Sequence, residues 1–186
     1  LFEYAQRAWQ RAEQNPVRIP WACLQLLCDN PRRYAGFISH WGALMIIVAV
    51  TLSKGYSHDQ ELTLKRGEAA QVGNYQLQLQ DIRAFQAPQR YEIKALVSVF
   101  QGEVLVDTLT PQMNYYPTSK EPIGSPAVRS TLLADLYLTL IHFEKDGSEA
   151  ALRVIETPAV AWIWIGGVVV MAGGLLAMAL RRRSDV

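Results

Sequence analysis

The sequence contains few of the residues from which catalytic and metal sites are usually built. Its 186 residues include two cysteines and three histidines, and Cys23 and Cys28 are too far apart for the C-x-x-C pattern of a redox pair. We expect no structural disulfide either, and we interpret both cysteines as small apolar residues of a short helix. No Walker, zinc-ligand or nucleophile-elbow pattern occurs in the chain. Known motifs therefore assign no catalytic residue.

An excess of charge of one sign is also missing, which argues against a nucleic-acid partner. The formal net charge is +1, whereas nucleic-acid binding needs a clustered basic surface. Half of the residues are hydrophobic, yet the mean hydropathy of +0.04 is too low for a bundle of membrane spans alone. This balance predicts a membrane protein with a substantial water-facing part.

Residues 34–52 form an apolar run without an acidic or basic side chain. As a helix, roughly 19 residues cover about 28 Å, close to the ~30 Å hydrocarbon core of a bilayer. The run contains His40, and a histidine inside a span is costly unless it is paired, ligated or facing a polar cavity. Gly36 and Ala43 leave the same helical face free of bulk. His40 is therefore a candidate functional residue, and the alternative is a neutral histidine hydrogen-bonded to a neighbouring helix.

A second uncharged run covers residues 160–180 and predicts a second membrane span. Trp162 and Trp164 at its start are typical of the membrane interface. Arginines precede the first run, at residues 32–33, and follow the second, at residues 181–183. The positive-inside rule therefore predicts that both termini are cytoplasmic and that the segment between the spans is external.

Four glycines in the second run form a small-residue surface suited to close helix packing, with ordinary glycine content as the alternative. They are Gly166, Gly167, Gly173 and Gly174.

The segment between the spans has a β pattern. Alternating or β-branched runs predict strands at residues 61–64, 75–81, 91–100, 104–109, 136–143 and 151–155. Turn signals separate them at Gly67, Gly73-Asn74, Gln101-Gly102 and Asp146-Gly147. The proline-containing residues 111–129 predict a long irregular loop. Five to seven short antiparallel strands indicate a sandwich or a partly open barrel.

Two further histidines belong to this segment. His142 continues the spacing of Leu136, Leu138 and Leu140, so we interpret it as a strand residue rather than a ligand. His58 lies just beyond the first span, where a solvated histidine is the simpler interpretation and a ligand or proton relay is the alternative.

The fold class that follows is membrane α plus β, with two transmembrane helices flanking an external antiparallel β-rich domain. The expected boundaries are a cytoplasmic amphipathic and interfacial segment at 1–33, spans at 34–53 and 159–180, the β domain at 54–158 and a basic cytoplasmic tail at 181–186. Within the first segment we expect an amphipathic helix at 1–14 and a short apolar helix at 21–28. Charges and prolines through residues 1–30 predict no signal peptide before the first span.

A series of short motifs runs along nearly the whole chain. In order they are Asn30-Pro31-Arg32-Arg33-Tyr34-Ala35-Gly36, Ser39-His40-Trp41-Gly42, Tyr56-Ser57, Leu64…Gly67-Glu68, Tyr116-Pro117, Arg129…Asp135-Leu136-Tyr137, Trp162-Ile163-Trp164-Ile165-Gly166-Gly167 and Gly173-Gly174. Their order and spacing resemble the CcmF family, the haem-lyase subunit of bacterial cytochrome c maturation. The resemblance covers only the C-terminal portion of that family's larger polytopic proteins. The family's tryptophan-rich external segment, its two flanking histidines and its other intramembrane histidine have no counterpart here.

The resemblance implies a role for His40 as a haem iron axial ligand. His40 matches the family's second intramembrane histidine, which ligates a buried haem b. Trp41 stands where many relatives have an aliphatic residue, and Ser125 falls where a Thr-Glu pair is common. The family transfers haem and attaches it to apocytochrome c outside the membrane, and the b-type haem is thought to keep the transferred iron reduced. A chain with one of the two axial imidazoles is expected to lack haem-attachment activity alone.

The resemblance also implies a location and partners. The location is the bacterial inner membrane, with a periplasmic β domain. The partners are the remaining CcmF-like helices, the haem chaperone CcmE, and apocytochrome c with its thiol-reducing and chaperone subunits. Two alternatives stay open from the sequence. One is a membrane-anchored scaffold that binds a partner without haem and uses His40 only for packing, and the other is a ResB-type cytochrome c assembly protein.

Reporter fusions test the predicted topology. A reporter that is active only outside the cytoplasm should be active when inserted at Gly102 and inactive when fused after Val186, because the arginines flank both spans on one side. An active reporter after Val186 would contradict the assignment.

Overall fold

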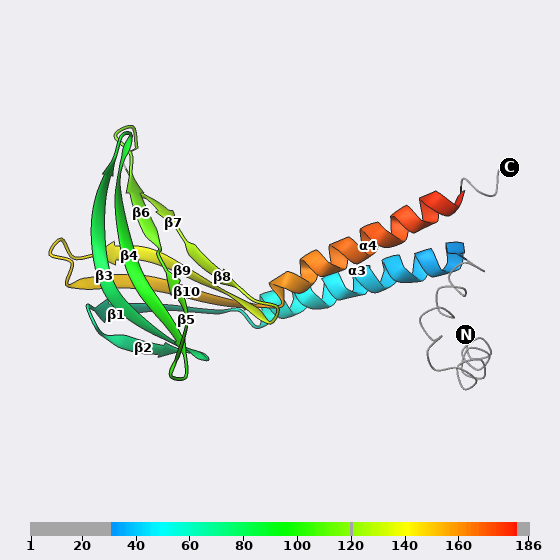
Figure 1. The fold of residues 1–186 in the computed structure, drawn as a ribbon, viewed down its shortest axis with the longest axis horizontal. Coiled ribbons are helices and arrows are strands. Elements are labelled where there is room, and N and C mark those ends of the chain that lie inside the picture. The colour runs from blue at the N-terminus through cyan, green and yellow to red at the C-terminus, as the bar shows by residue number, and fades with distance from the viewer. Residues whose placement is uncertain (1–30, 120, 182–186) are drawn as a thin grey trace. The chain divides into compact units, whose positions relative to one another are not determined.

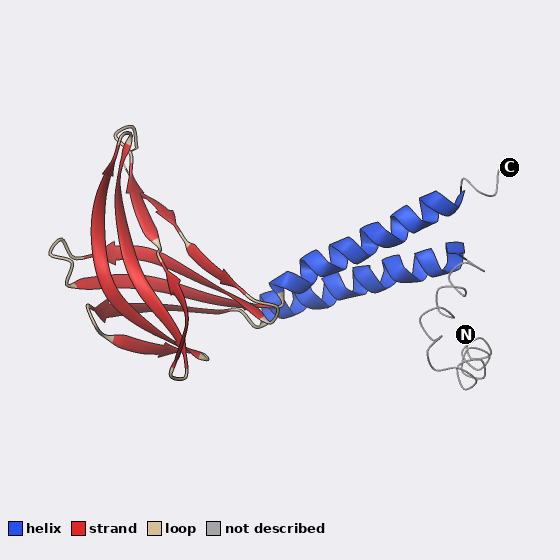
Figure 2. Cartoon of the chain, in the orientation of Figure 1, coloured by secondary structure: helices blue, strands red, loops and turns tan. Residues whose placement is uncertain are grey.

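The computed structural model describes residues 31–119 and 121–181. The helices expected at residues 1–14 and 21–28 and the end of the basic tail lie outside the described residues. The chain divides into two compact units, a helical unit that includes residues 31–47 and 163–181 and a β unit at residues 48–162. Figure 2 shows that helix and strand segregate along the chain, with strands throughout the middle segment.

Both predicted membrane spans are confirmed as long apolar helices. They are α3 (Pro31–Gly55) and α4 (Val160–Arg181), and each contains a stretch long and apolar enough to cross a membrane. Helix α3 begins three residues earlier than predicted because a proline is well tolerated in the first turn of a helix. The helix ends at Gly55, and glycine is common at helix ends. Lys54 in the last turn complements the partial negative charge of the helix C-terminus.

Helices α3 and α4 approach each other at glycines. A Cβ atom placed on Gly42 would lie 2.7 Å from the carbonyl oxygen of Gly166 and 2.7 Å from the backbone nitrogen of Val170. A Cβ atom on Gly173 would lie 2.8 Å from the carbonyl oxygen of Ala35. The neighbouring atoms are backbone atoms, which cannot rotate away, so this contact depends on the absence of side chains.

Only two of the four glycines that predict close packing serve the α3–α4 contact. Gly166 and Gly173 face α3, whereas a Cβ atom on Gly167 or Gly174 would have no atom within 4 Å. The prediction of close packing is therefore confirmed for one side of α4, and the other two glycines lie on a side that α3 does not cover.

The β unit is a sandwich of two antiparallel sheets, rather than a single sheet or a closed barrel (Figure 1). One sheet has four strands in the order β1-β10-β9-β8, and the other has six, with the order β2-β3-β4-β6-β7 and with β5 also paired to β4. The bounds are β1 (His58–Lys65), β2 (Ala69–Val72), β3 (Tyr75–Ala87), β4 (Arg90–Gln101), β5 (Val104–Leu109), β6 (Gln112–Tyr115), β7 (Ile123–Ser125), β8 (Ala127–Ser130), β9 (Ala134–Phe143) and β10 (Glu149–Pro158).

The core lies between the two sheets and consists of alternating strand residues. Burial of every second residue is the pattern expected for strands with one face in a core. The fully buried leucines and valines are Leu64, Leu77, Leu79, Val97, Val99, Leu136, Leu138, Leu140, Leu152 and Val154. The predicted turn at Gly73-Asn74 joins β2 to β3, and Gly73 has a φ of 54°, which favours glycine. The alternation and the turn signals thus place most strands correctly.

The prediction of an irregular loop at residues 111–129 is wrong. Three short strands, β6, β7 and β8, lie in or at the end of this segment and pair with β4, with one another and with β9. The prolines fall outside the strands, so they interrupt pairing only between them. Strands of three or four residues carry too little periodicity to be recognised, and the total of ten strands exceeds the five to seven predicted for the same reason.

The spacing argument for His142 is also wrong. The β9–β10 register shifts so that Ala151 pairs with His142 and Leu152 pairs with Leu140, which leaves Ile141 as an extra residue. Such a β-bulge reverses the alternation beyond it. His142 therefore belongs to a strand, as predicted, but its side chain is 72% exposed instead of following the buried leucines.

Glycine substitutions in α4 test the helix contact. We expect Gly173→Val to destabilise the helix pair by about 1–3 kcal/mol, because the added atoms meet the backbone of α3. Gly174→Val is the matched control, since it has the same β-branched side chain on the open side of the same helix. Unfolding in mixed detergent micelles, followed by circular dichroism, measures the difference, and equal stabilities would contradict the glycine contact.

Candidate functional site

His40 lies in the first half of α3 and its side chain is exposed. The ring nitrogen Nδ1 is 2.7 Å from the carbonyl oxygen of Gly36, one helical turn earlier. Because a carbonyl oxygen can only accept, Nδ1–H donates this hydrogen bond. The neutral ring then has Nε2 as an unprotonated nitrogen, which can accept a hydrogen bond or bind a metal ion.

The packed face of α3 does not include His40. Ala35 and Gly42 are buried on the α4 side, and the hydroxyl of Ser39 lies 3.4 Å from the carbonyl oxygen of Val170. At 3.6 residues per turn, His40 projects roughly 140° around the axis from the middle of this face. Within the described residues, His40 therefore makes no packing contact with α4, and the α3–α4 contact turns the imidazole outward.

The surroundings of His40 are small on one side and apolar on the other. A Cβ atom on Gly36 would meet no atom within 4 Å, and Ala43 is exposed. On the other side, Phe37 is 41% exposed and Leu44 is 52% exposed. A flat apolar group could therefore approach the imidazole past Gly36 and Ala43, and the larger side chains would line its edge.

The other two histidines do not join His40. His58 begins β1, and its Nδ1–H donates to the carbonyl oxygen of Tyr56 at 3.1 Å. His142 lies 3.9 Å from Glu144, with both side chains well exposed. Across the described ranges 31–119 and 121–181, no group of three or more histidine, cysteine, aspartate or glutamate side chains could hold a metal ion. Any metal ligated by His40 needs a further ligand from elsewhere.

The ion pair beside His58 is structural. Asp59 on β1 accepts a hydrogen bond from Arg153 Nε on β10 at 2.9 Å, and both side chains are about half exposed. This hydrogen bond holds the pKa of the Asp59 carboxyl below its ordinary value. The pair therefore joins β1 to β10 and is already satisfied, so the Asp59 carboxylate is not an obvious partner for His58.

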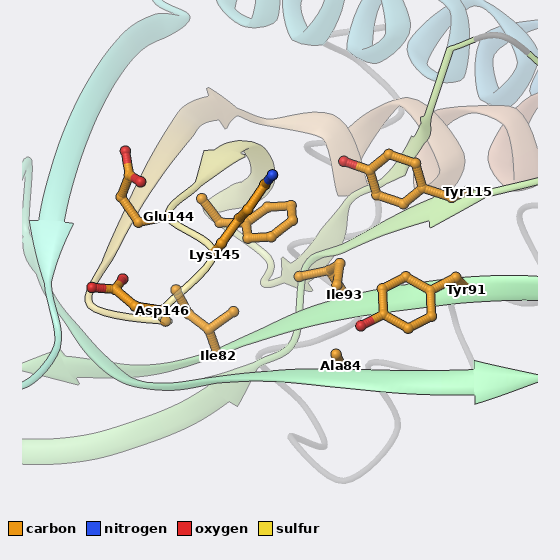
Figure 3. A pocket seen from close by; sticks show the side chains of 10 residues that line it. Ile82, Ala84, Tyr91, Ile93, Tyr115, Glu144, Lys145 and Asp146 are labelled. Carbon is orange, nitrogen blue, oxygen red and sulfur yellow. The ribbon is translucent and has the colours of Figure 1, made fainter.

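A groove of about 580 Å³ opens where the two sheets of the β unit separate (Figure 3). Its lining consists of Ile82, Ala84, Tyr91, Ile93, Tyr115 and Phe143, with the β9–β10 turn residues 144–147 at the rim. The turn is well formed, because Ser148 donates to the Asp146 carboxylate and lowers the pKa of that group. Among the lining residues there is no nucleophile paired with a base, so the groove offers a contact surface rather than catalytic chemistry.

The sequence prediction missed this groove for a structural reason. Tyr91 and Tyr115 are far apart in the chain and become direct neighbours only because β4 pairs with β6. Strand β6 lies in the segment predicted to be an irregular loop, so the pairing could not be anticipated.

The β unit matches a known protein family. Residues 55–158 match the model described as the CcmF C-terminal beta-sandwich. The chain is also similar to the cytochrome c-type biogenesis protein CcmF of Haemophilus influenzae, with 30% identity over 145 residues, which are 78% of this chain and 22% of that protein. The cytochrome c-type biogenesis protein ccl1 of Rhodobacter capsulatus is 29% identical over 183 residues, which are 98% of this chain and 27% of that protein.

A solved structure gives the same result for the fold. The chain is similar to the cytochrome c haem lyase CcmF, with a TM-score of 0.63 and 26% sequence identity, over 80% of this chain and 25% of that chain. The chain therefore spans about a quarter of the length of these relatives. The resemblance seen in the sequence is confirmed, and the ResB-type alternative is superseded by the CcmF match.

Nitrogen chemical shifts test the geometry at His40. In the full chain, with ¹⁵N-labelled histidine and reconstituted in lipid, His40 should be the Nδ1–H tautomer, because the Gly36 carbonyl accepts from Nδ1. The spectrum of a His40→Gln variant assigns the signal by its loss. A dominant Nε2–H tautomer at His40 would contradict the hydrogen bond to Gly36.

Proposed function

Because this chain belongs to the CcmF family, we propose that it is part of a haem lyase that acts in cytochrome c biogenesis. In this proposal His40 is one axial ligand of a haem b within the membrane, and the chain helps the complete assembly to transfer haem and attach it to apocytochrome c. The family membership supports the process, and the residues of α3 support the role of His40.

The observation that carries the proposal is the orientation of the His40 imidazole. Its Nδ1–H donates to the Gly36 carbonyl at 2.7 Å, and the exposed ring lies on the side of α3 away from the α4 contact, which leaves Nε2 available. A hydrogen bond from the far nitrogen is the usual arrangement of a metal-ligating histidine, since it fixes the ring and raises its basicity. In an apolar span the second ring nitrogen also needs a hydrogen-bond partner or a metal ion, and haem iron would be that partner.

The residues around His40 would perform three tasks toward the haem. Gly36 holds the ring orientation through its carbonyl and leaves room for a planar group, as does Ala43. Phe37 and Leu44 provide apolar surface that excludes water from the iron ligand. The bound haem would supply one-electron chemistry, with a potential set by its ligands and its surroundings.

The proposed site is complete only with further polypeptide. Two helices do not enclose a haem, and the described residues hold no second histidine near His40. We therefore propose that the remaining CcmF-like helices supply the second imidazole and cover α3, and that CcmE, apocytochrome c and its thiol-reducing and chaperone subunits are the partners. We place the assembly in the bacterial inner membrane, with both termini cytoplasmic and the β unit periplasmic, on the basis of the flanking arginines.

A scaffold function without haem is the second candidate, and the groove at Tyr91 and Tyr115 favours it as a place for a partner protein. The absorption spectrum of the purified complete assembly separates the two candidates, because only the haem-ligating function gives a b-type spectrum.

Substitution of His40 tests the proposed ligand. In the complete assembly, His40→Ala should remove or strongly shift the b-type haem spectrum and reduce cytochrome c maturation, because the iron loses an axial ligand. The span should still insert, since alanine is more easily accommodated in a membrane than histidine. Added imidazole should restore part of the haem signal by filling the vacated position.

The matched controls are His58→Ala and His142→Ala, which remove exposed histidines of the β unit. Both should leave the haem spectrum unchanged. An unchanged spectrum in His40→Ala would refute the ligand assignment and leave the scaffold function as the better account.

A further inference from the structure

The turn between β8 and β9 presents two leucines to the surroundings. Leu132 is 65% exposed and Leu133 is 80% exposed, and the turn that contains them is closed by hydrogen bonds. The hydroxyl of Thr131 donates to the carbonyl oxygen of Ala134 at 2.7 Å and accepts from the backbone nitrogen of Ala134 at 3.1 Å. The outward position of the leucines is therefore built into the turn, and consecutive exposed leucines indicate a contact surface.

The same turn is hydrogen-bonded to the residues at the start of α4. The backbone N–H of Ala159 donates to the carbonyl oxygen of Leu133 at 2.8 Å, and the indole Nε1–H of Trp162 donates to that of Leu132 at 2.8 Å. Ala159 has a φ of 61°, an uncommon conformation for a residue other than glycine. Such strain persists only where the surroundings hold it, so the junction is well defined.

These contacts place the leucines at the level where the membrane span begins. The apolar window of α4 starts at Val160, within one turn of both hydrogen bonds. Trp162 is 43% exposed and Tyr56, next to the end of α3, is 64% exposed. Aromatic residues that combine an apolar ring with a polar group are typical of the membrane–water interface.

The charges near the turn do not oppose contact with lipid. Residues 131–134 are uncharged, and the flanking Asp135 is 5% exposed. Arg129, on the other flank, has a side chain that is 19% exposed and lies 3.6 Å from Asp107. Transfer of Leu132 and Leu133 from water into the lipid interface would therefore not bury an exposed charged side chain.

We propose that the β8–β9 turn inserts Leu132 and Leu133 into the interfacial region of the lipid bilayer that α3 and α4 cross. The occupant of this surface is lipid, because the turn is fixed to the start of a membrane span and carries two apolar side chains beside an interfacial tryptophan. The β unit thereby has a membrane contact of its own, in addition to its two helix connections.

Spin labelling of the full chain tests the proposal. A nitroxide is attached to Leu133→Cys in a Cys23→Ser, Cys28→Ser background, and the protein is reconstituted into vesicles of phosphatidylcholine and phosphatidylglycerol. The label should collide more often with oxygen, which dissolves in lipid, than with a water-soluble nickel complex. The control is Ile141→Cys, an exposed apolar position on β9. At the rise of an extended strand it lies roughly 26 Å along the chain from residue 133, and collisions with nickel should dominate there.

Two results would overturn the proposal. A label at position 133 that collides with nickel as often as the label at position 141 would mean that the turn lies in water. A label that neither reagent reaches would mean that protein covers the leucines instead of lipid. If Leu133→Cys fails to give the circular dichroism spectrum of the unlabelled chain, Leu132→Cys provides the same measurement at the adjacent position.

Discussion

The close backbone contact between α3 and α4 is the constraint on which the functional argument depends. Gly42, Gly166 and Gly173 allow the two helices to meet at backbone atoms, and any side chain at these positions would displace one helix. This contact fixes which side of α3 is hidden. His40 lies on the opposite side of α3. The packing that stabilises the helix pair therefore leaves the imidazole accessible to a ligand or to another helix in the membrane.

Sequence periodicity predicted the parts of the structure whose pattern is local. The two spans are long uncharged runs, and the Gly73-Asn74 turn needs a residue that tolerates positive φ, so both could be recognised from neighbouring residues alone. Strand β6 and the bulge at Ile141 could not be recognised from neighbouring residues. The first is stabilised by pairing with β4, and the second changes the direction of His142 through one extra residue that leaves no mark on composition.

The candidate site was predictable in identity but not in geometry. An isolated histidine in an apolar span is a strong signal because burial of an unpaired imidazole is costly. The hydrogen bond to Gly36 and the outward direction depend on helix packing, which the sequence indicated only through its glycines. Conversely, the aromatic groove depends on strand pairing, and the contact of the β8–β9 turn with the start of α4 depends on hydrogen bonds between distant residues. Both appear only in the folded β unit.

We propose centrally that His40 binds haem iron through Nε2, and the identity of the axial ligands can be measured directly. Near-infrared magnetic circular dichroism of the ferric haem responds to the type of each axial ligand, and the measurement is made on the complete assembly with wild-type His40 and with His40→Met. We expect two imidazole ligands in the wild type and one imidazole with one thioether in the variant. Two imidazole ligands in both proteins would contradict it.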